Sequence, residues 1–243
     1  MPHGMPDWGL MGPKTVTYGL DDMGELAVRL GSPHLWDRRG DALHMTDFRE
    51  GLGIFRWGVS GAGAEVALCT GHSRSGAYSV RLRAGSNLDR LAYLRARFSV
   101  QEPSCVGQEF TFALGDTTTE LHGEIDWFDG VFAHYGRVRY SVALGQLHYY
   151  TTGAAWVLLQ GGVFINFADR PEHTLKVVVD MDLNEYVRVR LDHQAWDVRG
   201  VPVNEEVAPI PEAWQFTIRH YGLGGWNPDS YIDDVIITQN EPR

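Results

Sequence analysis

The stretch VDMDLNEYVRVRLD, residues 179–192, indicates most directly which fold this chain adopts. Its second half alternates between apolar and charged side chains, which are Val187, Arg188, Val189, Arg190 and Leu191. Successive side chains of a strand point to opposite faces of a sheet. The alternation therefore predicts a strand with Val187, Val189 and Leu191 on one face. The first half of the stretch predicts its hairpin partner, with the chain turning through residues 182–185.

The same kind of pattern recurs from about residue 43 to the end of the chain. Runs rich in β-branched and aromatic residues are separated by Gly, Asn, Asp or Pro turns, and the 28 glycines suit such a chain. The other predicted strands are GAEVALC, YSVRLRAG, LAYLRARFSV, EFTFALG, TELHGEIDWF, GRVRYSVAL, QLHYYTT, AAWVLLQ, GVFINF, HTLKVVVDM, QAWDV, WQFTIRHYG and SYIDDVIITQ. Many short strands without helical stretches between them predict an all-β fold, an antiparallel β-sandwich of the jelly-roll type, over residues 43–243.

Composition excludes some classes of function. The chain has 243 residues, 44% of them hydrophobic, and a net charge of −10, which repels nucleic acid and anionic lipid. The densest basic stretch, residues 81–98, spreads its arginines along alternating strands, which predicts a solvent-exposed face. The longest apolar runs are short, such as residues 154–159, so we expect no membrane span. Nucleic acid and membrane are therefore not expected partners.

Residues 1–42 differ from the rest and predict an N-terminal arm with one short helix. Apolar residues recur there at helical spacing, and they are Leu20, Met23, Leu26 and Leu30. Asp22 and Glu25 have the spacing of a capping box, and Gly31 stands where a C-terminal cap would. The apolar stripe either folds back on its own domain or docks on another chain. The first fourteen residues have neither a basic nor an apolar region of a signal peptide, so we expect no export signal.

The chain has two cysteines, Cys69 and Cys105. Disulfides form and persist mainly in oxidising, secretory compartments. Without a visible export signal, we expect two free and mostly buried thiols rather than a disulfide.

Three stretches carry a family resemblance. TDFREGLGIFRW (46–57), HSRSGAYSVRLRAG (72–85) and SYIDDVIIT (230–238) resemble, in order and spacing, the first, second and last strands of carbohydrate-binding-module-like and concanavalin-like jelly rolls. Phage virion structural proteins also use this kind of domain. The resemblance implies the fold over about residues 43–240 but leaves the ligand open, because this architecture hosts enzymes, sugar binders and structural proteins.

The resemblance also implies a structural calcium between the first and last strands. Its oxygen ligands here would be Asp47, Glu50, Asp234 and the carbonyls near Ser75 and Gly76. This chain departs from the family at Arg49, where a carboxylate is usual. The alternative is therefore a salt bridge from Arg49 to Asp233 or Asp234 in place of the ion.

GEIDWFDG, residues 123–130, resembles the E-I-D-x-x-E strand of a β-sandwich glycosidase group. In that motif the first Glu is the nucleophile, the Asp orients it and the last Glu is the acid/base. Glu124 and Asp126 match, but Asp129 is one methylene short. It is also expected on the opposite face of the strand, and Asp129-Gly130 is a common turn pair. The sequence thus favours a strand end over a catalytic pair, and we expect no enzyme.

Sugar binding without cleavage needs exposed aromatic faces together with a few polar groups. The candidate ligand-binding residues are Trp127, Tyr135, Tyr149, Trp156, Glu124 and Asp126. Tyr149 and Tyr150 must point to opposite faces, so at most one of them joins a given platform.

These observations lead to three hypotheses about function. The first is a non-enzymatic structural protein of a phage virion or similar assembly, made in the host cytoplasm without a signal peptide. It would be a homo-oligomer or contact other virion proteins, held partly by the arm. The alternative is a carbohydrate-binding module with glycans as partners. The third is a β-sandwich glycoside hydrolase that uses Glu124 and Asp126.

Overall fold

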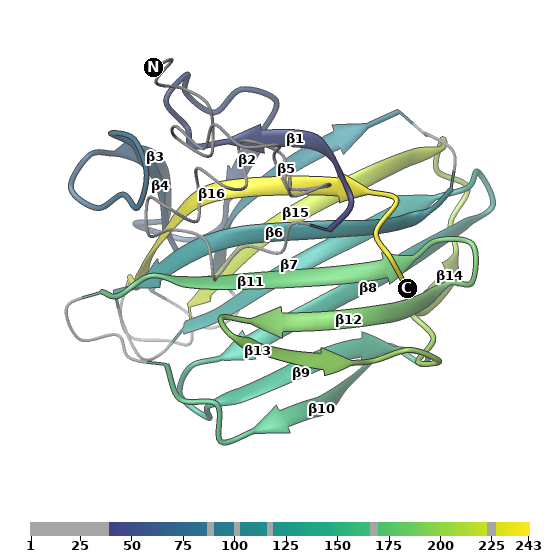
Figure 1. The fold of residues 1–243 in the computed structure, drawn as a ribbon. Helices are drawn as coiled ribbons and strands as arrows, with labels where there is room; N and C mark the ends of the chain where they lie inside the picture. The colour runs from purple at the N-terminus through teal and green to yellow at the C-terminus, as the bar shows by residue number, and fades with distance from the viewer. Residues whose placement is uncertain (1–38, 87–89, 100–102, 116–118, 166–169, 223–226) are drawn as a thin grey trace, which may run out of the picture. The chain divides into compact units, whose positions relative to one another are not determined.

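The structure is a computed structural model, and it describes residues 39–86, 90–99, 103–115, 119–165, 170–222 and 227–243. Sixteen strands in these residues form two antiparallel sheets of eight strands each (Figure 1). The all-β sandwich predicted from the sequence is confirmed. The described part of the chain holds no helix long and apolar enough to cross a membrane. The predicted arm helix, with Leu20, Met23, Leu26 and Leu30, lies outside the described residues.

The first sheet has the order β13-β12-β11-β6-β16-β4-β3, with β1 paired to β16. Its strands are β13 (Gln194–Asp197), β12 (Glu185–Leu191), β11 (His173–Asp180), β6 (Cys105–Leu114), β16 (Asp229–Gln239), β4 (Ser79–Arg83), β3 (Glu65–Cys69) and β1 (Asp41–Thr46). The second sheet has the order β10-β9-β8-β7-β15-β5-β2, with β14 paired to β8. Its strands are β10 (Ala155–Gly161), β9 (Gln146–Thr151), β8 (Phe132–Ser141), β7 (Thr119–Phe128), β15 (Ala213–Gly222), β5 (Arg90–Phe98), β2 (Arg56–Val59) and β14 (Asn204–Val207).

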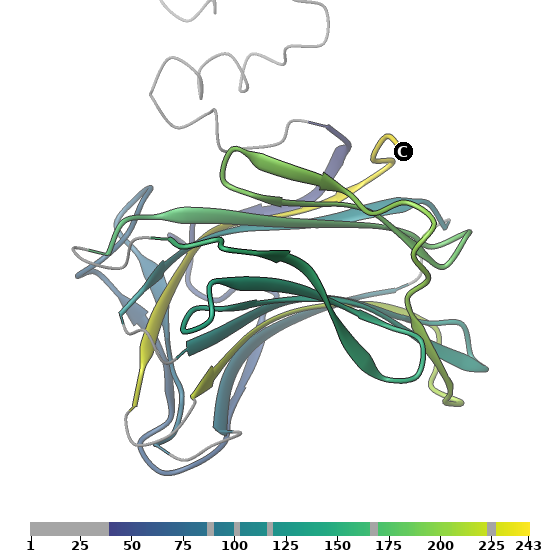
Figure 2. The same cartoon turned by 90° about the horizontal axis from the view of Figure 1, so that it is seen from below.

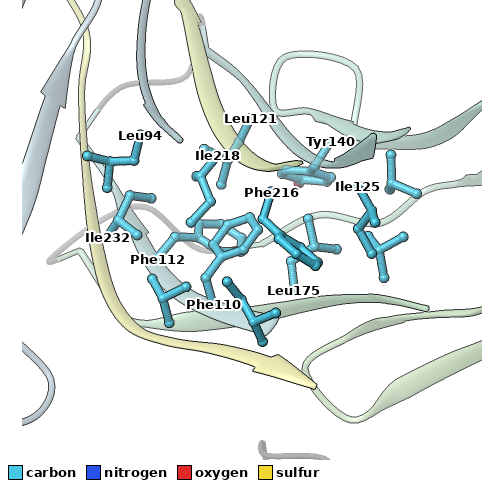
Figure 3. Packing of buried hydrophobic residues seen from close by; sticks show 14 of the residues in the cluster. Leu94, Phe110, Phe112, Leu121, Ile125, Tyr140, Leu175, Phe216, Ile218 and Ile232 are labelled. Carbon is cyan, nitrogen blue, oxygen red and sulfur yellow. The ribbon is translucent and has the colours of Figure 1, made fainter. Parts of the chain in front are cut away.

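The two sheets stack face to face as layers (Figure 2) and enclose one main core. Phe110 and Phe112 of β6 pack from the first sheet toward Leu121 of β7 and Phe216 of β15 in the second (Figure 3). All four side chains are at most 1% exposed. Each strand thus uses one face for the core and leaves the other face of its sheet for other roles.

The hairpin predicted from residues 179–192 is present as β11 and β12, but one residue breaks the predicted alternation. The register shifts where Val178 pairs with Arg188 and Val179 pairs with Tyr186, which leaves Val187 as an extra residue. Val189 and Leu191 join the main core with Tyr186, whereas Val187 packs with Val178 and Cys105 in a separate cluster. The prediction that Val187 shares a face with Val189 is therefore wrong, because a β-bulge reverses the side-chain order.

β1, β2 and β14 are missing from the strands predicted by alternation, and the run at residues 46–57 that resembles a first strand joins β1 to β2 instead; one predicted strand is not formed. β1, β2 and β14 are short edge segments with little alternation. The run GVFINF has no strand at residues 162–165, and residues 166–167 lie outside the described part.

Cys69 and Cys105 are free thiols, as predicted.

Candidate functional site

The outer face of the second sheet gathers the charged residues of β7. Glu124 and Asp126 lie two residues apart on this strand and face away from the core, while Ile125 between them is buried in it. Each is only 1% exposed, although it sits on an outer face. Directly opposite residues of paired strands share a face, so the register identifies their neighbours. Glu124 lies between Arg137 of β8 and Thr217 of β15.

Arginines neutralise both carboxylates. Arg137 donates to Asp126 through two bonds, Nε to Oδ1 and Nη2 to Oδ2, each 2.9 Å long. Arg219 donates from Nη2 to Glu124 Oε2 at 2.8 Å. The Nε2 of Gln215 donates to Asp126 Oδ2 at 3.3 Å. Such charge-assisted bonds are what permit carboxylates to be buried.

Burial and the neighbouring arginines shift the pKa values of these two carboxyl groups in opposite directions. Burial alone would raise the pKa of Glu124, but the nearby His122 ring, with Nδ1 3.7 Å from Glu124 Oε1, and the charges of Arg219 and Arg137 bring this pKa below its ordinary value. Burial raises the pKa of Asp126, and the charge of Arg137 opposes it only in part. Burial lowers the pKa of Arg219, but the charge of Glu124 and the interactions with Tyr221 together outweigh burial and raise this pKa above its ordinary value. Glu124 is therefore the ionised centre of the cluster.

Aromatic rings stand around this charged centre. The His122 ring lies 4.6 Å from that of Tyr221 and 5.2 Å from that of Trp156. Trp156 also contacts Tyr150, with ring centroids 5.1 Å apart, and carries the Arg139 guanidinium 4.8 Å above its ring. The rings and charges enclose a hollow of about 270 Å³ in the outer face. Its lining residues are Glu120, His122, Glu124, Arg137, Arg139, Tyr150, Trp156, Arg219, Tyr221 and Gly222.

A tyrosine from the opposite sheet fixes the floor of this hollow. Tyr186 of β12 is fully buried, and its hydroxyl reaches the backbone of β8 and β9. The backbone N–H of Arg137 donates to this hydroxyl at 2.8 Å, and the hydroxyl donates to the carbonyl of Tyr150 at 2.7 Å. It therefore holds the backbone of two residues that line the hollow.

The structure places Asp129 in the turn after β7, away from the hollow. Its Oδ1 accepts the backbone N–H of Val131 at 2.8 Å and that of Phe132 at 2.6 Å, and Gly130 follows with φ +91°. Two hydrogen bonds from backbone amides are the largest reason that the pKa of Asp129 is lowered. The expected Asp-Gly turn is thus present, and the third carboxylate of the glycosidase-like motif does not join Glu124 and Asp126.

Only some of the predicted sugar-binding residues come together. Trp156 lines the hollow beside Glu124, and Tyr135 lies on the same outer face, with the Arg137 guanidinium 4.2 Å above its ring. Trp127 and Tyr149 point the other way. Trp127 is 5% exposed in the core and stacks on His134, and Tyr149 packs against the core beside Tyr186. The prediction that Trp127 and Tyr149 belong to one sugar-binding platform with Glu124 and Trp156 is therefore wrong. On their strands they alternate with the residues that face outward, so their own side chains face the core.

The sequence reasoning missed several residues of the hollow. These are Glu120, His122, Arg137, Arg139, Tyr150, Arg219 and Tyr221. Alternation from Glu124 would have placed Glu120 and His122 on the same face. The contributions of β8, β9 and β15 depend on strand pairing, which a single sequence does not specify.

The residues of the predicted calcium site are gathered only in part. The Ser75 hydroxyl donates to Asp234, which stands at φ +45° in a bulge of β16. Asp47 lies beside Gly76, where an added Cβ would be 3.0 Å from its Oδ2. Glu50 is exposed in the turn after β1 and forms no hydrogen bond or ion pair in the described part of the chain.

Arginines supply positive charge at this point. Arg49 pairs with Asp47 at 3.0 Å rather than with Asp233 or Asp234, so that predicted alternative is wrong. Arg74 lies 3.9 Å from Asp234 instead. Calcium takes six to eight oxygen ligands, and the described residues hold no group of three or more His, Cys, Asp or Glu that could bind a metal. The residues present fit a cluster neutralised by arginine better than they fit a calcium ion.

Comparisons with known proteins define the fold class. No family model matches the chain, and no curated protein matches its sequence. Among solved structures, it is similar to an endo-β-1,4-glucuronan lyase from the fungus Trichoderma reesei, with TM-score 0.56, 9% identity and coverage of 82% of this chain and 96% of that one. It is also similar to the cellulose induced protein Cip1, with TM-score 0.50, 14% identity and coverage of 80% and 96%.

A sialidase is similar as well, with TM-score 0.50, 11% identity and 83% of this chain covered; the match spans 19% of the sialidase. At such low identities these similarities establish the fold alone. The similarities support the all-β sandwich fold that the sequence resemblance predicted.

Proposed function

We propose that this chain binds carbohydrate in the hollow on the outer face of the second sheet. The observation that carries the proposal is the meeting of three aromatic residues, Trp156, Tyr150 and Tyr221, around the ion pair of Glu124 and Arg219. Sugar rings present apolar C–H faces and hydroxyl edges, so a binding site needs both aromatic surfaces and charged or polar groups. This hollow supplies both within one small area.

Polar atoms in the hollow support this proposal further. Arg139 Nε and Arg219 Nε belong to residues that line the hollow, are buried, and form no hydrogen bond with the part of the chain that the structure describes. A buried polar atom without a partner costs about 1–3 kcal/mol. Hydroxyl groups of a bound sugar would accept hydrogen bonds from these two arginines. Binding would then offset part of the free energy that is lost when these polar atoms are buried without a hydrogen-bond partner.

The same geometry favours binding over hydrolysis. Glu124 and Asp126 are both engaged by arginines, and the third acid of the glycosidase-like motif lies in a turn. Retaining glycosidases place two free carboxyl groups about 5–5.5 Å apart across the scissile bond. The glycosidase alternative predicts turnover that disappears in Glu124→Gln, whereas simple binding predicts no turnover in the unaltered protein.

The role in a virion stays a prediction. It rests on the arm, whose residues Leu20, Met23, Leu26 and Leu30 lie outside the described part. The predicted homo-oligomer and virion partners depend in part on the same arm, and the virion location stays a prediction as well. Deleting residues 1–39 would test it, since the arm hypothesis expects a folded sandwich that no longer assembles.

Affinity electrophoresis tests the carbohydrate proposal. The unaltered protein should be retarded by at least one polysaccharide in a panel of plant, microbial and animal glycans. Trp156→Ala should remove the retardation. Trp57→Ala is the matched control, because Trp57 is 53% exposed on β2 but on the opposite side from the outer-face residues. Retardation that survives in Trp156→Ala, or that is absent with every glycan, would contradict the proposal.

A further inference from the structure

The outer face is not electrically uniform. Over β7 and β8, the carboxylates of Glu120, Glu124 and Asp126 accompany the arginines. Over β15, β5 and β2 the outward positions carry four arginines and no carboxylate. These arginines are Arg219, Arg95, Arg97 and Arg56. Positive charge is therefore concentrated on one half of the face, in a chain with a net charge of −10.

Strand register places Arg56 and Arg95 side by side. Arg56 is directly opposite Arg95, and Arg95 is directly opposite Thr217, which in turn is opposite Glu124. The row from Glu124 to Arg56 thus crosses four neighbouring strands, at about 4.8 Å per strand. The arginine pair continues the site described above toward the edge of the sheet.

Arg56, Arg95 and Arg97 have no carboxylate partner among the described residues, whereas Arg219 pairs with Glu124. Arg95 donates from Nε to Thr217 Oγ1 at 3.4 Å, and Arg97 donates to the Pro211 carbonyl at 3.2 Å. Arg56 is exposed and forms no ion pair in the described part. Like charges that face each other across two strands destabilise a sheet. The placement of Arg56 opposite Arg95 therefore lowers the stability of the folded sheet, and no carboxylate among the described residues offsets this repulsion.

Tyr93 completes this half of the face. Its ring lies over Gly58 of β2, where an added Cβ would be 2.5 Å from the tyrosine hydroxyl. The guanidinium of Arg95 stands 4.9 Å from the centre of the ring. Glycine at position 58 thus allows an aromatic ring to lie flat beside the arginine pair.

We propose that the ligand of this face is an anionic polysaccharide, whose carboxylate or sulfate groups pair with Arg56, Arg95 and Arg97. This inference rests on the proposed carbohydrate-binding function and adds the class of ligand. The hollow with Trp156 and Tyr150 binds sugar rings at one end of the polysaccharide segment. The arginines pair with acidic groups further along the same polysaccharide. Guanidinium groups match the planar geometry of carboxylates and bind oxyanions through paired N–H donors. A polymer with repeated charges is favoured because the positive positions are spread across strands rather than gathered in one pocket.

Matched polysaccharide pairs test this inference. Polygalacturonate is compared with its carboxyl-reduced form, and dextran sulfate with dextran, by affinity electrophoresis and calorimetry. The unaltered protein should bind at least one acidic member more tightly than its neutral partner, and this difference should shrink as salt is raised. Whether the carboxylated or the sulfated polymer is preferred identifies the acidic group.

Single variants locate the charge contacts. Arg56→Gln, Arg95→Gln and Arg97→Gln should each weaken binding of the acidic polymer by about twofold to fivefold, as expected for one exposed ion pair. Arg95→Lys should retain more affinity than Arg95→Gln. Arg199→Gln is the control, because Arg199 is an exposed arginine after β13 in the other sheet. Arg56→Gln should not lower the melting temperature, since it removes a like-charge contact.

The outcomes separate the two proposals. If neutral and acidic members bind equally, or if the three glutamine variants bind the acidic polymer as the unaltered protein does, the inference is wrong while carbohydrate binding stands. If no polysaccharide of either kind binds, the proposed function itself fails. Equal retardation by single-stranded DNA, lost in the same variants, would also overturn the inference, because the face would then bind polyanions without regard to sugar.

Discussion

The ion pair of Arg137 and Asp126 offers the sharpest test of the outer-face geometry. The Asp126 side chain is 2% exposed and that of Arg137 is 23% exposed, and two bonds of 2.9 Å join them. Arg137→Met removes the guanidinium and leaves a buried carboxylate that keeps only Gln215 as a side-chain donor, at 3.3 Å. Breaking a buried pair from one side typically costs about 3–5 kcal/mol. Because water reaches Arg137, we expect about 2–4 kcal/mol here.

Urea unfolding at neutral pH measures this loss as a shift of the midpoint. The matched control is Arg199→Met, which breaks the exposed pair of Arg199 with Asp197 and should leave the midpoint unchanged. The double variant Asp126→Asn/Arg137→Met should be more stable than Arg137→Met alone, because the asparagine carries no buried charge. If Arg137→Met costs no more than Arg199→Met, the carboxylate is not buried as described.

The pH dependence of Arg137→Met supplies a second readout. Burial already raises the pKa of Asp126, and loss of the guanidinium should raise it further. A carboxyl group with a raised folded-state pKa favours the folded state when it is protonated, so its cost appears as pH rises above the unfolded-state pKa. The deficit of Arg137→Met should therefore be larger at pH 8 than at pH 5. A deficit independent of pH would indicate that lost packing, rather than an unpaired charge, is responsible.

Three further predictions concern stability. Asp129→Ala should cost about 0.5–1 kcal/mol at neutral pH, because the turn loses two amide hydrogen bonds; since the pKa of Asp129 is lowered, the deficit should vanish as pH falls below its folded-state value, which acid titration of unfolding checks. Tyr186→Phe should cost about 1–3 kcal/mol in urea unfolding, because buried backbone groups of Arg137 and Tyr150 lose their partner. Burial raises the pKa of Glu172 to about 7, so it should stabilise the protein at pH 5 relative to pH 8; thermal melts of Glu172→Gln should show a flatter pH profile, and an unchanged profile would contradict this reading.

Local alternation was sufficient to predict the fold and part of the site. Strands with period-two patterns, such as β7 and β12, were found because their periodicity is a property of adjacent residues. The same rule correctly placed Glu124 and Asp126 on one face, and the Asp129-Gly130 pair correctly indicated a turn. Alternation also predicts that Trp127 points away from Asp126 on a regular strand. Trp127 was nevertheless included in the sugar-binding platform, because it is close to Asp126 in the sequence.

What alternation could not provide was the pairing of distant strands. Arg219 is 95 residues from Glu124, and their contact depends on the register of β15 against β7. Pairing register follows from the packing of the whole sandwich rather than from either strand alone. The bulge at Val187 was hidden for the same reason, since an extra residue is defined only against its partner strand. The row of arginines across β15, β5 and β2 therefore emerged only from the structure.

Oxidative footprinting of the protein with and without its best-binding polysaccharide tests the central claim most directly. Hydroxyl radicals modify exposed aromatic side chains, and mass spectrometry locates each modification. Carbohydrate bound in the hollow should protect Trp156, Tyr150 and Tyr221 and leave Trp57 and Phe164 as reactive as before. Protection confined to other residues, or a bound polysaccharide that protects none of these three aromatic side chains, would show that the outer face of the second sheet is not the binding site.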